Sequence, residues 1–373
     1  MSGKRPAPES PKAEAQHKNS RFKPNSPLAP VSADTSDTEN VADEQDEPQG
    51  PIELDDANTS NGYESASDGG SSIATSLASS IRDYNFENRR RYHKYNEGQY
   101  NFPNDEPEQE RENMKHHMIV ALCDNELHNA PIKGPRKVVD FGTGTGIWAI
   151  EVGEKYPEAE IDGLDLSPIQ PPFVPPNVSF LVDGVEAEWL YPENSIDYVH
   201  LRHMAPSIKD WPKLLCQAYK ALKPGGWLEL QDIVPEYKCD DGTMPPPEQY
   251  TPAKTLDLIT EGLAHLGVDL RAGNSHAGRI EAAGFRSLMH DIKKVPVGSW
   301  PKDAHLKSIG SYAHAMIYDG LHGNTIGSFT RGLGWSREEV EVFLVQVRKE
   351  MTDNAVHPYI FYHSYAAQKP TGL

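Results

Sequence analysis

The chain has 373 residues, enough for one large domain or two ordinary ones, and carries a formal net charge of −19 at pH 7. This negative charge argues against direct nucleic-acid binding, because phosphate contacts draw on Lys and Arg. Three widely spaced cysteines, no long apolar run and no signal-like N-terminus lead us to expect a soluble protein without a membrane span, in the nucleus, the cytoplasm or both.

Residues 1–80 are rich in Ser, Pro, Asp and Glu, and hold six Lys or Arg against fourteen Asp or Glu. Such a segment has too little apolar surface to offset the entropy lost on ordering, so we expect a disordered acidic tail. All six bases fall between Lys4 and Lys23, and ten acids follow between Asp34 and Asp56. A basic start before an acidic block is typical of a solvated tail, and less often of a targeting or partner-binding arm.

Residues 81–135 form the next expected segment. Its first part, up to Phe102, is aromatic and basic, which indicates the ordered edge of the fold. Asn104 or Asp105 is positioned to cap a helix that runs through Glu108 to about His128 and packs on, or lids, the next domain. The apolar face of that helix would hold Met114, Met118, Ala121 and Leu122.

From residue 136 to the end we expect one domain in which strands and helices first alternate, a pattern that predicts a mostly parallel sheet with helices on both faces. The expected strands are 137–141, 160–165, 178–182, 196–201 and 227–233. The expected helices are 146–156, one around 185–190, and 211–222, with a short or irregular crossing near Ile169.

Beyond about residue 240 the alternation stops, and we expect helical insertions. The predicted helices are 253–266, 275–283, 305–318 and 336–351. Two further strands are predicted at 286–295 and 358–366, the last pairing antiparallel with its neighbour and closing the sheet. The prediction is therefore an α/β fold with a seven-stranded, mostly parallel sheet and an antiparallel last strand.

A glycine-rich turn follows the first of these strands, in the stretch Val138–Ile150. Gly142, Gly144 and Gly146 lack a Cβ, so the backbone can approach a ligand closely, and the helix start behind them favours a negatively charged group. The spacing departs from the Gly-x-Gly-x-x-Gly of dinucleotide sites, and the Gly-Lys-Ser/Thr of a P-loop is absent. An NAD-dependent oxidoreductase is therefore disfavoured.

Two acids narrow the choice of the expected ligand. Asp165 ends the strand after the glycine turn, where an acid is placed to hold the two hydroxyls of a ribose. Asp140, beside the helix start, suits a ligand with an amine and a carboxylate but no phosphate. That combination describes S-adenosylmethionine better than NAD.

Four stretches, in order, resemble the motifs of Rossmann-like, class I S-adenosylmethionine-dependent methyltransferases. They are Asp140–Gly146, Gly163–Pro168, Asp197–Val199 and Leu222–Trp227. More closely, Gly144–Pro157 and Asp165–Pro172 are similar to the fungal LaeA-type methyltransferases, which include velvet-associated regulators of secondary metabolism and enzymes of metabolite gene clusters. The resemblance covers roughly residues 84 to 370.

The resemblance implies a set of cofactor-binding residues. They are Asp140, Gly142, Thr143, Gly144, Gly146, Asp165, Leu166, Asp183, Gly184, Val185 and Arg202. Asp140 and the glycines would contact the methionine part and Asp165 the ribose. Family members often carry an acid where this chain has Gly184, so the adenine contact is either Asp183 or Glu186.

The loop after the strand at 196–201 would lie beside the transferable methyl, which makes His203 the candidate catalytic residue, as general base or substrate orienter. A packing histidine is the alternative. Arg202 is a candidate for the cofactor carboxylate or an acidic substrate group, or else for a surface ion pair. Further residues have two interpretations each, as site or as core: Trp148 and Trp189 beside the adenosine, and Tyr312, His314 and Tyr318 around the acceptor.

No metal site is expected, because Asp240-Asp241-Gly242 predicts a turn rather than a magnesium site. We expect methyl transfer from S-adenosylmethionine to a protein or small-molecule acceptor, linked to the regulation of fungal secondary metabolism or development. The alternative is a methyltransferase-fold interaction module in a nuclear regulatory complex, with incidental or no catalysis. Velvet-type or other protein partners would then bind the tail or the aromatic segment.

Overall fold

The computed structural model describes residues 84–95, 98 and 100–372, all of which belong to one compact unit. The expected disordered tail, residues 1–80, lies outside the described residues.

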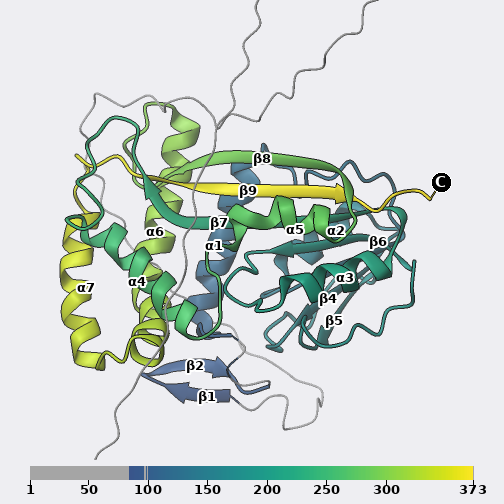
Figure 1. The fold of residues 1–373 in the computed structure, drawn as a ribbon, viewed down its shortest axis with the longest axis horizontal. Coiled ribbons are helices and arrows are strands. Elements are labelled where there is room, and N and C mark those ends of the chain that lie inside the picture. The colour runs from purple at the N-terminus through teal and green to yellow at the C-terminus, as the bar shows by residue number, and fades with distance from the viewer. Residues whose placement is uncertain (1–83, 96–97, 99, 373) are drawn as a thin grey trace, which may run out of the picture. The chain divides into compact units, whose positions relative to one another are not determined.

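Seven strands form one mixed sheet in the order β5-β4-β3-β6-β7-β9-β8 (Figure 1). Their bounds are β3 Lys137–Phe141, β4 Glu160–Asp165, β5 Val178–Val182, β6 Ile196–Arg202, β7 Leu222–Lys238, β8 Arg286–Pro296 and β9 Tyr359–Gln368. Strands β3 to β7 pair in parallel, and β9 runs antiparallel between β7 and β8. The predicted α/β sheet with an antiparallel last strand is confirmed, and its order reverses between β3 and β6, where ligands of such sheets bind.

Helices cover both faces of the sheet. They are α1 Glu106–Leu122, α2 Ile147–Lys155, α3 Trp211–Ala221, α4 Thr251–His265, α5 His276–Ala282, α6 Ala304–Gly327 and α7 Arg337–Met351. Helix α2 packs on the side of Val138 and Tyr198, whereas α3 and α5 pack on the side of Val139 and Val199. Because side chains alternate along a strand, these neighbouring residues build two separate cores.

Helix α1 begins where the sequence predicts. The Asp105 carboxylate accepts a hydrogen bond from the backbone N–H of Glu108 at 3.3 Å and so caps the helix. The predicted end at His128 is wrong, because Asp124 and Asn125 adopt positive φ angles of 56° and 65°, which no α-helix contains.

The predicted helix at Val185–Leu190 is also wrong, since these residues form a turn. The Trp189 ring stacks on Phe141 with centroids 3.9 Å apart, and its indole N–H donates to the carbonyl of Val185. The Gln217 side chain of α3 satisfies the backbone N–H of Trp189 and the carbonyl of Ala187. Contacts to distant residues therefore replace the hydrogen bonds that a helix would make.

A hairpin at the N-terminal edge of the fold was not predicted from the sequence. Strands β1 Tyr84–Glu87 and β2 Arg90–His93 form this hairpin, and its turn residues, Asn88 and Arg89, have φ angles of 52° and 64°.

Helix α6 is longer than predicted. It runs nine residues beyond its predicted end at Tyr318, to Gly327, despite its glycines. A Cβ on Gly323 would lie 2.8 Å from the Arg90 guanidinium, so this glycine lets the hairpin arginine pack on the helix.

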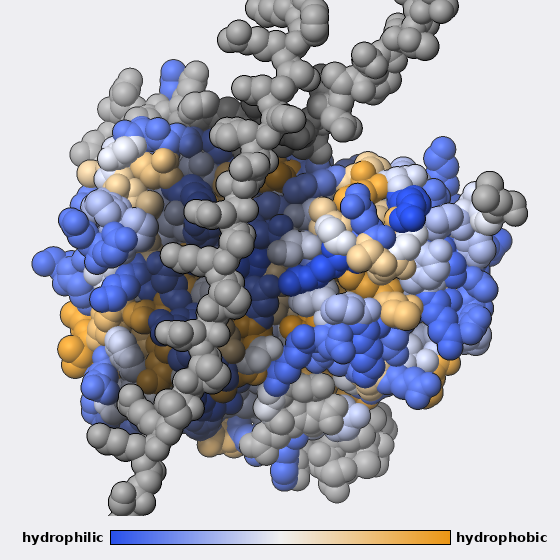
Figure 2. Space-filling model, in the orientation of Figure 1, coloured by the Kyte–Doolittle hydropathy of each residue, from blue (hydrophilic) through white to orange (hydrophobic). Residues whose placement is uncertain are grey.

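Most of the face shown in Figure 2 is hydrophilic, and apolar residues gather at its lower left, where Figure 1 places α7. That helix exposes Val342 and Val345. None of the described helices combines the length and the apolar character that a membrane crossing requires.

Candidate active site

A cavity of about 280 Å³ opens at the carboxyl ends of β3, β4, β6 and β7. The loops that leave these strands form one side of it, and residues of α1, α4 and α6 form the other. A smaller hollow adjoins it beside α2. Both lie at the reversal of the strand order.

The glycine turn after β3 forms part of the cavity wall. Gly142 has a φ of 72°, and a Cβ added there would meet the Met204 sulfur at 2.1 Å. Gly142 and Gly144 line both hollows, whereas Gly146, at the start of α2, packs against the Phe180 ring and lines neither. The buried hydroxyl of Thr143, which lines the smaller hollow, has no hydrogen-bond partner among the described residues.

The Asp165 carboxylate sits at the end of β4 and lines the cavity together with Leu166. Its two oxygens accept backbone hydrogen bonds from Gly144 and Ser167, each at 2.9 Å. Burial, which these hydrogen bonds only partly offset, raises the pKa of Asp165 to about 6. Each oxygen keeps a lone pair for a further donor.

The loop after β5 brings both candidate adenine contacts to the cavity, with Val185 between them. Asp183 accepts a hydrogen bond from the backbone of Gly184 at 2.7 Å, and Gly184 itself is not part of the lining. Glu186 instead accepts from the backbone N–H groups of Lys209 and Asp210, ahead of α3. The Asp183 carboxylate is therefore the less engaged of the two acids.

Asp140 is buried and faces the smaller hollow. Its Oδ1 accepts a hydrogen bond from Nδ1 of His200 at 2.7 Å. The His200 ring lies flat on Trp148, with centroids 3.6 Å apart and planes 8° from parallel. Trp148 packs in the core, as the second of its two sequence interpretations states, and its ring supports the imidazole that orients Asp140.

Arg202, at the end of β6, faces both hollows. Its guanidinium donates to Nδ1 of His116 at 2.6 Å, and the opposite nitrogen of that ring donates to Glu151 at 3.0 Å. Burial and the charge of Arg202 lower the pKa of His116 to about 2, so His116 is a neutral acceptor. Arg202 therefore meets an uncharged partner and keeps its positive charge for a ligand.

His203 lines both hollows and has a φ of 58°, which is uncommon outside glycine. Its backbone N–H donates to the carbonyl of Gln231 at 2.7 Å. Nε2 of its ring is buried and has no partner among the described residues. Burial, with Lys115 and Arg202 nearby, holds the pKa of His203 well below its usual value, so the ring is neutral.

One group among the described residues, His116, His117 and Glu151, has atoms close enough together to hold a metal ion. Because Nδ1 of His116 accepts from Arg202, the ring proton sits on Nε2, and that nitrogen has no lone pair to give a metal. The group does not suit a metal ion. Asp240 and Asp241 lie in the predicted turn and bond to Lys294 and to Thr243 and His357, respectively.

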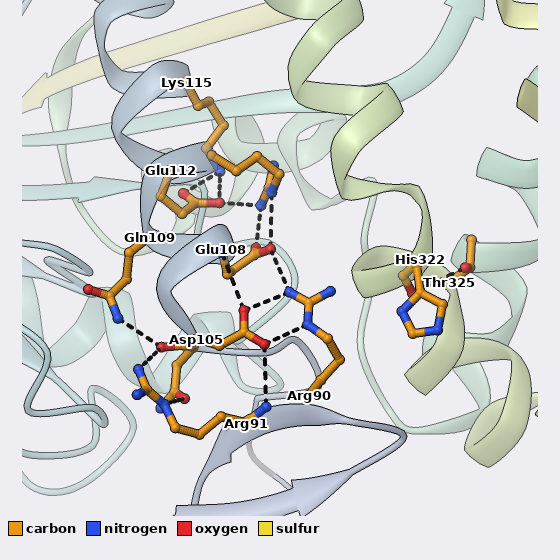
Figure 3. Close-up of polar contacts among 11 residues, drawn as sticks. Arg90, Arg91, Asp105, Glu108, Gln109, Glu112, Lys115, His322 and Thr325 are labelled. Atoms are coloured by element: carbon orange, nitrogen blue, oxygen red, sulfur yellow. Dashed lines mark hydrogen bonds and ion pairs between the residues drawn. The ribbon is translucent and has the colours of Figure 1, made fainter. Parts of the chain in front are cut away.

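A row of alternating charges, here the charged row, runs from the hairpin along α1 and was missed in the sequence (Figure 3). Its members are Arg90, Asp105, Glu108, Arg111, Glu112 and Lys115. Arg90 binds Asp105 through two hydrogen bonds of 2.6 and 2.8 Å, and Lys115 pairs with Glu112 at 2.6 Å. The signal available was two pairs of opposite charge spaced three residues apart, Glu108 with Arg111 and Glu112 with Lys115.

Apart from polar residues such as Asp232 and Asn324, the remaining wall of the cavity is apolar. It is formed by Phe102, Ile233, Leu256, Ile259, Leu270, Met316, Ile317 and Ile360, which we call the apolar half. Tyr312, His314 and Tyr318, the predicted acceptor residues of α6, do not line the cavity, because the helix turns Met316 and Ile317 toward it instead.

Comparison with known proteins identifies the family. Residues 114–274 match the family described as a methyltransferase domain. The methyltransferase pytC of Aspergillus terreus is 42% identical over 301 residues, which cover 80% of this chain and 92% of pytC. The secondary metabolism regulator LAE1 of Cochliobolus heterostrophus is 35% identical over 76% of this chain and 94% of its own length.

The protein-methionine methyltransferase laeA of Emericella nidulans is 32% identical over 76% of each chain. These similarities, over 76% to 80% of this chain, accompany a Rossmann-like sheet whose glycine turn and acids surround the cavity. The chain belongs to the fungal LaeA-type family of class I S-adenosylmethionine-dependent methyltransferases.

Proposed function

We propose that this enzyme transfers the methyl group of S-adenosylmethionine to a protein or small-molecule acceptor that enters the apolar half of the cavity. One observation carries this proposal: a single cavity is lined by seven of the eleven predicted cofactor residues and by an apolar wall from α4 and α6. An acceptor in contact with that wall lies next to the cofactor residues.

The donor set suits S-adenosylmethionine. Asp165 would accept hydrogen bonds from the ribose hydroxyls, and Asp183 would accept one from the adenine amino group. Arg202, whose partner is neutral, would bind the carboxylate of the methionine part. Asp140, fixed by His200, would receive the ammonium group beside the turn at Gly142.

The cofactor, when bound, supplies an activated methyl group on a sulfonium, so the chain needs mainly to align the acceptor with it. His203 lies at the end of β6 with a neutral ring and a free Nε2. We assign it the orientation of the acceptor and, where the acceptor bears a proton, the removal of that proton.

Titration calorimetry with S-adenosylmethionine tests the cofactor assignment. The wild-type chain should bind, and Asp165→Ala should bind about 10- to 100-fold more weakly, because two hydrogen bonds to a charged group are lost. Undiminished binding by Asp165→Ala would refute the assignment.

Relatives named as secondary metabolism regulators support a role in secondary metabolism or development. We infer that the chain acts in the nucleus, the cytoplasm or both, and that protein partners contact the tail or the hairpin β1–β2. The exposed Phe86 of β1 favours the hairpin as one contact. Cross-linking at Phe86 replaced by a photoreactive residue tests this, and cross-links to no protein would contradict it.

A further inference from the structure

We propose that the acceptor is an uncharged, mostly apolar small molecule whose hydroxyl or enol group is methylated next to His203, rather than a thioether or an anion. This inference rests on the proposed function and adds the acceptor's chemical class. It rests further on the wall of the apolar half, the pairing of nearby charges, and the unpartnered nitrogen of His203.

The apolar half is an interior surface. Ile259, Met316 and Ile360 are each at most 5% exposed, yet they line the cavity. These side chains offer dispersion contacts and no hydrogen bonds, which suits an apolar molecular body. They come from α4, α6 and β9, so the wall is assembled from segments distant in sequence.

The nearby cations do not favour an anionic acceptor. Arg111 is bonded to Glu108 and Glu112, and Lys115 to Glu112. Both cations are thereby neutralised within the charged row. Arg202 carries the cofactor carboxylate under the proposed function, which leaves no further cation among the described lining residues for a phosphate or carboxylate.

His203 distinguishes a hydroxyl from a thioether. Its buried Nε2 lacks a partner within the described part of the chain, and leaving such an atom unpaired costs free energy that a donor would recover. A hydroxyl or enol donates a hydrogen bond to that nitrogen, whereas a thioether has no proton to donate. Methylation of a thioether would leave Nε2 unsatisfied throughout.

The proposed step is balanced in atoms and electrons. The acceptor oxygen forms its bond to the methyl carbon while the carbon–sulfur bond breaks, and that bonding pair stays on the sulfur. The acceptor proton passes to Nε2 of His203, which releases it to water when the product leaves. The product is a neutral methyl ether, whereas a thioether acceptor would give a permanently charged sulfonium.

The test uses the full chain, S-adenosylmethionine with a labelled methyl group, and two acceptor pools from a culture of the organism that produces this chain: its ethyl acetate extract and its dialysed protein. Ile259→Trp fills the apolar half, and Val342→Trp places the same ring on exposed α7 as the matched control. His203→Asn tests the base, since asparagine tolerates the positive φ. Calorimetry on every variant measures cofactor binding separately.

We expect label in neutral, ethyl acetate-soluble products. The rate should fall more than about 10-fold in Ile259→Trp and about 100-fold in His203→Asn, with cofactor affinity unchanged and Val342→Trp at the wild-type rate. Label confined to protein or to charged sulfonium products, no label in the extract, or an undiminished rate in Ile259→Trp would overturn the inference. Absence of cofactor binding by the wild type would instead overturn the proposed function.

Discussion

At the scale of single residues, Asp165 combines two opposed demands. In its proposed role the Asp165 carboxylate accepts hydrogen bonds from two ribose hydroxyls, for which the charged form is the better acceptor, yet burial raises its pKa to about 6. Protons and cofactor therefore compete for the same group near neutral pH.

We expect the affinity for S-adenosylmethionine to fall as pH decreases through about 6, because protonated Asp165 loses acceptor capacity. Calorimetry between pH 5 and 8 measures this dependence. Asp165→Asn should bind weakly with a flat profile across that range. A wild-type profile equally flat would contradict the role of Asp165.

The same shift predicts a stability effect in the cofactor-free protein. The folded-state pKa lies above the unfolded value of 3.8, so the contribution of Asp165 is fully present below pH 3.8 and is lost as pH rises through about 6. At pH 7.5 the buried charge is a cost that Asp165→Asn does not carry, so between pH 5 and 7.5 the wild type should lose more stability with rising pH than Asp165→Asn does. An identical pH dependence of the melting temperature in the two proteins would contradict this sign.

Substitution of Gly142 should affect both cofactor binding and stability. Gly142→Ala forces a positive φ on alanine and places its Cβ 2.1 Å from the Met204 sulfur, so cofactor binding should be lost and stability should fall by about 1–3 kcal/mol. Gly278→Ala, in helix α5 with nothing within 4 Å of the added Cβ, is the control and should keep both. Denaturant unfolding and calorimetry report the two quantities.

Some site residues were predictable and others were not. Asp165, Asp183 and the glycine turn follow strand ends, and parallel strands bring such residues to one edge. His116 and His200 were missed because their roles depend on Arg202 and Asp140, their partners across the fold. Sequence spacing does not reveal which distant side chain a buried ring meets.

At the scale of elements, the loop after α1 is joined to β7 by Glu229. This carboxylate, 0% exposed, accepts hydrogen bonds from the backbone of Asn129 and Ala130 and from the side chains of Tyr198, Gln231 and Ser364. One buried group thus ties the loop after α1 to strands β6, β7 and β9 of the sheet.

Glu229→Gln would turn an amide NH₂ toward several of these donors. We expect a loss of about 3 kcal/mol in the free energy of unfolding, as for a broken buried network. Urea unfolding measures it, with the exposed Glu158→Gln as a control that should change little. A loss of the same size in both variants would show that the hydrogen bonds of Glu229 do not stabilise the fold more than an exposed glutamate does.

The predictable elements are those with strong local patterns. Strands β3, β4 and β5 have the predicted bounds because each is a short run that ends at an acid, a glycine turn or both. The turn at Val185–Leu190 was missed because Trp189 stacks on Phe141, a contact that no local pattern encodes. Strand β7 extends to Lys238 because β9 continues to pair with it, up to Tyr359.

At the scale of the whole molecule, the cavity is built by residues between Tyr100 and Ile360. Deleting residues 1–80 should therefore leave cofactor affinity and melting temperature unchanged, as calorimetry and a thermal melt would show. Deleting residues 1–104 removes Arg90 and its pair with Asp105, so melting should occur several degrees lower. If both deletions changed the melting temperature by the same amount, residues 81–104 would have no stabilising role and the prediction would be wrong.

The stack of Trp148 on His200 has an optical consequence. An indole 1% exposed emits at short wavelength, and an imidazole 3.6 Å from its ring quenches that emission to a degree set by the imidazole's hydrogen bond. We expect a ligand that reaches Asp140 to alter this bond and therefore the emission of Trp148. Tryptophan emission should therefore report whether a ligand occupies the methionine end of the site. Trp148→Phe should remove this change in emission.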